Sequence, residues 1–83
     1  MIEYILVSMK TLECMLGEIE MYSKSHDPLI LDGLDIYNKQ LGAYTLKLAE
    51  MALTTGASED ELRCLQVLNE TFELVMAEMR KAR

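Results

Sequence analysis

Apolar residues recur along this chain at alternating steps of three and four residues. Such spacing places side chains on one stripe of an α-helix, as in the a and d positions of a helical bundle or a short coiled coil. Three stretches show the pattern, and we predict that each stripe faces a shared core. Their apolar positions are Ile2, Ile5, Met9, Leu12, Leu16 and Ile19, then Leu34, Tyr37, Leu41, Tyr44, Leu48 and Met51, then Leu65, Leu68, Phe72, Val75 and Met79.

Residues that start and stop helices separate the three stretches. Asp27 is suited to an N-cap, and Pro28 to the first helical position, where its missing N–H costs nothing. Gly56 fits the left-handed residue that ends a helix, and Ser58 with Glu61 matches an S-x-x-E capping box. Both breaks therefore predict short, well-defined loops.

These signals predict helices over about residues 2–24, 28–54 and 58–82. A chain of 83 residues makes one domain at most, so we expect a single helical domain, 1–83. The predicted fold is all-α, either a three-helix antiparallel bundle or an extended helical hairpin with coiled-coil-like heptads.

A second set of apolar residues lies on the opposite side of each predicted helix. At about 100° per residue, these positions are roughly 160–180° away from the main stripe. Wide buried stripes and a few exposed apolar residues explain part of this pattern. The remainder predicts a surface that another molecule covers. The residues predicted to bind a partner are Val7, Cys14, Met21, Leu46, Leu53, Val67 and Leu74. The expected partner is a second copy of the chain or a different, helical protein.

Composition narrows the classes of partner. The net charge is −6 and no basic patch is visible, which argues against direct binding to nucleic acid. No apolar run approaches the roughly 18–20 residues of a membrane span. Cys14 and Cys64 lack the spacing of a metal motif and indicate free thiols in a reducing compartment. We therefore expect a cytoplasmic protein without a membrane span.

Residue types that carry catalysis are few. His26 is the only histidine, lies in a predicted loop, and has no second histidine four residues away. Asp32 and Asp35 share a helix face near the start of the second helix, where carboxylates favour the positive end of the helix dipole. No phosphate-binding glycine loop and no nucleophile–histidine arrangement is present. We predict no enzyme activity, no catalytic residues, no cofactor and no metal ion.

One resemblance covers Leu41 to Met79, where the positions concerned are Leu48, Leu53, Gly56, Ser58, Glu61, Leu65, Gln66, Leu68 and Phe72. In these residues one helix ends near a glycine, and a capped turn leads to a second, acidic and glutamine-bearing helix. The stretch resembles the helical-hairpin co-chaperones of type III secretion needle subunits. The resemblance implies a cytoplasmic chaperone that pairs with a second chaperone and keeps a helical subunit soluble.

A second resemblance is to the short helical phosphatases of bacterial phosphorelays. Asp27-Pro28 followed by Leu34-Asp35 looks like their loop and their Leu-Asp pair. Their motif also needs Ser and Gln just upstream, where this chain has Leu31-Asp32-Gly33, and the third helix is additional. The resemblance implies hydrolysis of an aspartyl phosphate with Asp35 as the acting residue.

The leading functional hypothesis is a non-catalytic helical interaction module, such as a small secretion-type chaperone or a regulatory subunit, that covers an apolar helix of its partner. Two alternatives stay open. One is the aspartyl-phosphate phosphatase, and the other is an acidic inhibitor protein that imitates nucleic acid and binds a basic enzyme.

Overall fold

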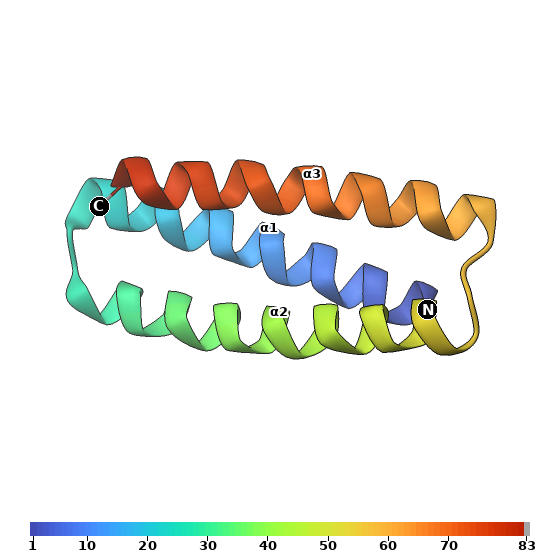
Figure 1. Cartoon of the computed structure of the whole chain (residues 1–83). Coiled ribbons are helices and arrows are strands. Elements are labelled where there is room, and N and C mark those ends of the chain that lie inside the picture. The colour runs from blue at the N-terminus through green and yellow to red at the C-terminus, as the bar shows by residue number, and fades with distance from the viewer. Residues whose placement is uncertain (83) are drawn as a thin grey trace.

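The computed structural model describes residues 1–82 and consists of three α-helices (Figure 1). Helix α1 spans Ile2–Ser25, α2 spans Pro28–Thr54 and α3 spans Glu59–Ala82. Each bound lies within one residue of the predicted limit, and residues 1–82 contain no strand. The predicted all-α, three-helix bundle is confirmed.

The first loop turns the chain within two residues. His26 adopts a left-handed conformation with φ of 53°, and its N–H donates to the carbonyl of Tyr22 at 2.8 Å. Asp27 is extended, and its carboxylate accepts a hydrogen bond from the N–H of Leu29 at 3.0 Å. This is the predicted N-cap, with Pro28 at the start of α2. The cap satisfies an N–H that would otherwise lack a partner at the helix start.

The second loop is longer and contains the capping box. Gly56 is left-handed with φ of 76°, as its predicted role requires. The N–H of Ser58 donates to Oε1 of Glu61 at 3.0 Å, and the N–H of Glu61 donates to Oγ of Ser58 at 3.2 Å. Both loops thus rest on local hydrogen bonds and reverse the chain. As a result α1 and α2 pack antiparallel, whereas α1 and α3 pack parallel.

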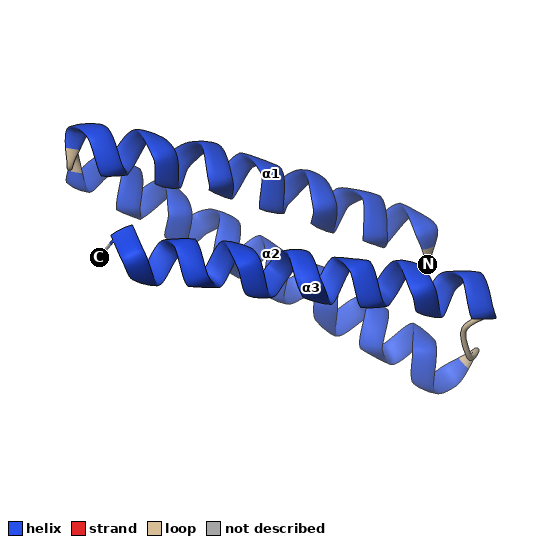
Figure 2. Cartoon of the chain, turned by 90° about the horizontal axis from the view of Figure 1, so that it is seen from above, coloured by secondary structure: helices blue, strands red, loops and turns tan. Residues whose placement is uncertain are grey.

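Helix α1 packs against both of the other helices. It lies between them in the view of Figure 1, and Figure 2 shows it set to one side of them. No Cα atom of α2 comes within 8 Å of a Cα atom of α3. The described molecule is elongated, with extents of 44 × 18 × 16 Å, and its N-terminus lies at the end where α2 joins α3. The bundle is therefore open along one side, between α2 and α3.

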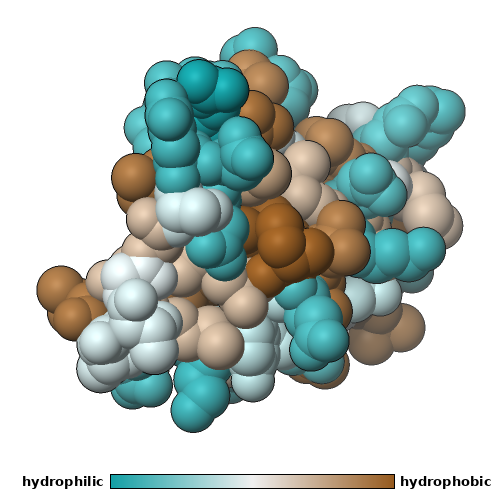
Figure 3. All heavy atoms as spheres, turned by 90° about the vertical axis from the view of Figure 1, so that its right-hand side faces the viewer, coloured by the Kyte–Doolittle hydropathy of each residue, from teal (hydrophilic) through white to brown (hydrophobic). Residues whose placement is uncertain are grey.

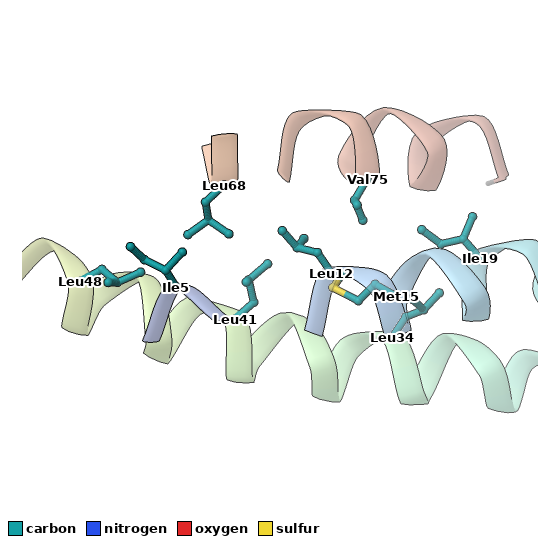
Figure 4. Packing of buried hydrophobic residues seen from close by; sticks show 9 residues of the cluster. All are labelled: Ile5, Leu12, Met15, Ile19, Leu34, Leu41, Leu48, Leu68 and Val75. Carbon is teal, nitrogen blue, oxygen red and sulfur yellow. The ribbon is translucent and has the colours of Figure 1, made fainter. Parts of the chain in front are cut away.

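The core is a single row of aliphatic side chains along α1. Leu68 and Val75 from α3, and the leucines of α2, point toward the α1 side chains (Figure 4). Leu12 and Met15 are fully buried at the middle of this row. The buried apolar residues are Ile5, Leu12, Met15, Ile19, Leu34, Leu41, Leu48, Leu68 and Val75.

The predicted stripe of α1 was wrong at two positions. Ile2 and Leu16 are 48% and 39% exposed, whereas Ser8, Thr11 and Met15 are buried. Helix α1 contacts two helices, so its buried surface is a broad arc instead of a narrow stripe. The two buried hydroxyls are compatible with this arc because each donates to the carbonyl four residues earlier, at 2.6 and 2.8 Å.

Candidate functional site

The open side of the bundle forms an apolar groove between α2 and α3, with Leu12 of α1 at its floor. Its volume is about 380 Å³. From Leu41 to Ala52 it follows α2 for about 17 Å, or three helical turns. No charged residue lines it. The lining residues are Leu12, Leu41, Thr45, Leu48, Ala49, Ala52, Leu65, Leu68, Asn69 and Phe72.

The wall of the groove on α2 is built from small side chains. Thr45, Ala49 and Ala52 follow one another at steps of four and three, so they form a row beside the buried Leu41 and Leu48. Small residues in such a row let the backbone of another helix approach closely. The spacing of these three small residues is visible in the sequence, but it was not among the predicted partner-binding positions.

The wall on α3 is built from larger side chains. Leu65 and Phe72 belong to the predicted core stripe, yet both are only half-buried, because they face the groove and not a neighbouring helix. Leu68, between them, is buried against α1. The stripe of α3 thus extends past the surface that α1 covers.

Six of the seven residues predicted to bind a partner are exposed, by between 41% and 87%: Val7, Met21, Leu46, Leu53, Val67 and Leu74. The seventh, Cys14, is half-buried on α1. None of the seven belongs to the buried core, and none lines the groove.

Two of these seven residues border the groove. Leu46 lies three residues before Ala49 and Leu53 four residues after it. Both are therefore neighbours of Ala49 on the helix surface, at the outer edge of the α2 wall. Leu62, also exposed, is one turn before Leu65 on α3. The end view of the molecule shows hydrophobic surface among the polar groups where α2 joins α3 (Figure 3).

The other predicted residues are not brought together with the groove. Val67 and Leu74 lie seven residues apart on α3, and the two residues one turn from both, Glu70 and Thr71, do not line the groove. Val7, Cys14 and Met21 belong to α1, which contributes only Leu12 to the groove. Apart from the half-buried Cys14, these positions are exposed apolar residues outside the groove.

A second depression lies between α1 and the end of α3. Its volume is about 530 Å³, and Glu20, Glu78 and Lys81 are among its lining residues. Lys81 and Glu78 form an ion pair at 3.3 Å. This depression is more polar than the groove, so it lacks the continuous apolar surface that a helix would cover.

Reactive side chains do not converge in the described part of the chain. His26 lies in the first loop with its ring 5.6 Å from that of Tyr22, and Asp32 and Asp35 are both exposed. In residues 1–82, no three His, Cys, Asp or Glu side chains are placed to hold a metal ion. Cys14 and Cys64 are free, half-buried thiols.

One carboxyl in the described residues has a clearly shifted pKa. The backbone N–H of Ser58, and then its hydroxyl, hold the pKa of Glu61 below the ordinary value by hydrogen bonding. The cause is the capping box, so the shift belongs to the start of α3 and not to a reactive site.

None of the helices in residues 1–82 is long and apolar enough to cross a membrane. No family model, no curated protein and no solved structure matches this chain.

Proposed function

We propose that this protein is a non-catalytic interaction module that binds an amphipathic helix of a different protein in the groove between α2 and α3. The observation that carries the proposal is the groove itself, which is apolar, three turns long and floored by the core residue Leu12. Recognition of a helix in a groove requires this kind of surface.

The arrangement of the helices supports a helical occupant. Neighbouring helices in a four-helix bundle have axes roughly 8–10 Å apart, so helices on the diagonal lie about 11–14 Å apart. Helices α2 and α3 both pack on α1 without approaching each other within 8 Å, as diagonal helices do. A fourth helix opposite α1 would therefore contact α2, α3 and Leu12 together and complete a four-helix core.

Charge favours a different protein over a second copy of this chain. Acidic residues outnumber basic ones on each helix, four to two on α1, three to two on α2 and six to three on α3. Two such chains repel each other, and any helix that one copy offers brings net negative charge to the groove of the other.

Covering an apolar helix is the task of a small chaperone or a regulatory subunit. A helix with an exposed apolar stripe aggregates on its own, and burial in the groove removes that stripe from water. The resemblance of residues 41–79 to secretion co-chaperones agrees with such a role, since α2 and α3 together form both that hairpin and the groove.

The test is selection from a displayed library of 18-residue peptides with apolar residues at a and d positions. Selected peptides are expected to bind the double variant Ala49→Gln/Ala52→Gln at least tenfold more weakly than the unmodified protein. The matched control is Ala43→Gln, an exposed alanine on α2 that does not line the groove, and it should bind normally.

Three results would overturn the proposal. They are a selection that yields no binder, binders that ignore the Ala49→Gln/Ala52→Gln change, and light scattering that shows a dimer which this double variant dissociates. The last result would identify a second copy as the occupant. Circular dichroism of each variant checks that the helices remain.

A further inference from the structure

Two polar side chains line the otherwise apolar groove, one on each wall. Thr45 belongs to α2 and Asn69 to α3, and every other lining residue is Leu, Ala or Phe. Asn69 is exposed, and its amide takes part in none of the side-chain hydrogen bonds within residues 1–82. The groove therefore holds a primary amide whose donors and acceptor are available to another molecule.

The two polar residues lie at the same level of the groove. In Figure 4, Leu68 stands between Leu48 and Leu41 along the bundle. Asn69 directly follows Leu68, and Thr45 lies between Leu41 and Leu48 on α2. Thr45 and Asn69 thus form one polar level, with apolar side chains of both walls on either side of it along the groove.

The hydrogen-bonding groups at this level match a second amide. The Thr45 hydroxyl donates to the carbonyl of Gly42 at 3.0 Å, so it offers its lone pairs to a partner. The Asn69 side chain offers an NH2 group and a carbonyl oxygen. An amide on the partner satisfies both residues, because it donates to their oxygens and accepts from the Asn69 nitrogen. An ammonium group only donates, and a carboxylate only accepts.

We infer that the partner helix carries Asn or Gln at the one inward-facing position that meets Asn69 and Thr45, with apolar residues at the inward positions before and after it. This inference rests on the proposed function and specifies one residue of its ligand. A covering helix removes Asn69 from water, and a buried amide without a partner weakens binding by about 5- to 150-fold. A polar residue within an apolar helix contact also fixes the register, because only one alignment pairs it. Asn69 is thus a specificity-determining residue of the groove.

A peptide library tests the inference. Each a and d position is varied among Leu, Asn, Gln, Lys and Glu. The protein is expected to enrich peptides that have Asn or Gln at a single central a or d position and Leu at the others. The variant Asn69→Ala should lose this enrichment while it still binds helices with an apolar stripe. The control Asn38→Ala removes the same amide from an exposed position of α2 that does not line the groove, and should keep the enrichment.

Affinities of one enriched peptide and of its form with Leu at the central position give the second measurement. The ratio of the two affinities should favour the amide peptide at least about 5-fold more in the unmodified protein than in Asn69→Ala. This difference should persist in about 0.5 M NaCl, because neither member of the pair is charged. Selected peptides without Asn or Gln at an inward position, or enrichment that survives Asn69→Ala, would overturn the inference and leave the groove as a helix-binding site. Binding that is indifferent to Ala49→Gln/Ala52→Gln would instead overturn the proposed function itself.

Discussion

The contact between α1 and α2 and the surface between α2 and α3 show two uses of the same kind of apolar pattern. Along the first, leucines at seven-residue intervals are covered by a neighbouring helix, and Leu34, Leu41 and Leu48 are almost completely buried. Along the second, Leu65 and Phe72 repeat with similar spacing but are only half-buried. Equal patterns thus produce a closed contact on one side and an open groove on the other.

The difference arises from what stands beside each stripe. On the side of α2 that faces α1, Tyr44 is half-buried with its ring 6.4 Å from that of Tyr4, so large side chains fill the contact. On the groove side the residues are Thr45, Ala49 and Ala52, which are too small to reach α3. The size of the flanking residues, and not the heptad pattern itself, therefore separates core from groove.

The largest effect is expected from truncating a leucine of the closed contact. Leu34→Ala should lower the free energy of unfolding by about 2–5 kcal/mol, because Leu34 is 1% exposed and its removal leaves a cavity in the core. Leu46→Ala makes the same chemical change at the edge of the groove and should cost less than about 0.5 kcal/mol. Urea denaturation followed by circular dichroism measures both.

The ratio of these two values is the informative quantity. Equal losses for Leu34→Ala and Leu46→Ala would mean that Leu46 is covered within the folded chain, and the contrast between closed contact and open groove would be wrong. If Leu34→Ala does not fold, Leu34→Val supplies a milder cavity on the same side and keeps the comparison measurable.

The fold was predictable because several local signals agreed. Asp27 with Pro28, and Gly56 with Ser58 and Glu61, marked helix ends through backbone requirements that do not depend on distant residues. The packing of α1 against both other helices was not predictable in the same way. Met15 is buried and Leu16 is not, because α1 contacts two helices at once, and the pattern of one helix cannot show how many neighbours it has.

The candidate site was predicted only at its edge. Leu46 and Leu53 were predicted to bind a partner because they lie opposite the main apolar stripe of α2; both are exposed, and they border the groove. The groove wall escaped prediction because Thr45, Ala49 and Ala52 are inconspicuous as single residues. Their meaning depends on α3 being held away from α2, which the packing of both on α1 determines.

Enlarging a side chain, instead of truncating one, should also distinguish the closed core from the open groove. Ser8→Leu places a larger side chain at a position with no exposed surface and should destabilise the fold by about 1–3 kcal/mol through overpacking. Ala49→Leu places a similar side chain in the groove and should change stability by less than about 1 kcal/mol. Thermal unfolding measures both variants, and a large loss for Ala49→Leu would show that the groove is already filled in solution.

Two glycine substitutions, one in a loop and one inside a helix, should change the free energy of unfolding by smaller amounts and in opposite directions. Gly56→Ala should cost about 1 kcal/mol, since its φ of 76° is unfavourable for a residue with a Cβ atom. Gly33→Ala should instead stabilise the protein by about 0.5–1 kcal/mol, because it lies inside α2 and an added Cβ meets no atom within 4 Å. Urea denaturation gives both signs, and a gain from Gly56→Ala would contradict the left-handed turn.

The smallest effect concerns the pH dependence of the capping box that begins α3. The lowered pKa of Glu61 in the folded chain means that its hydrogen bonds stabilise the fold fully above the unfolded value, roughly 4.3. This stabilisation is lost as the pH falls through the lower, folded pKa.

The carbon shift of the Glu61 carboxyl, followed by NMR against pH, should show a midpoint below the ordinary range. Ser58→Ala should raise that midpoint only in part, because the backbone N–H of residue 58 still donates to the carboxylate. Thr55→Ala should leave it unchanged, since the Thr55 hydroxyl donates to the carbonyl of Met51. A Glu61 midpoint at or above the ordinary value would mean that α3 begins without its reciprocal cap, and that the loop bounding the open end of the groove is less fixed than the first loop.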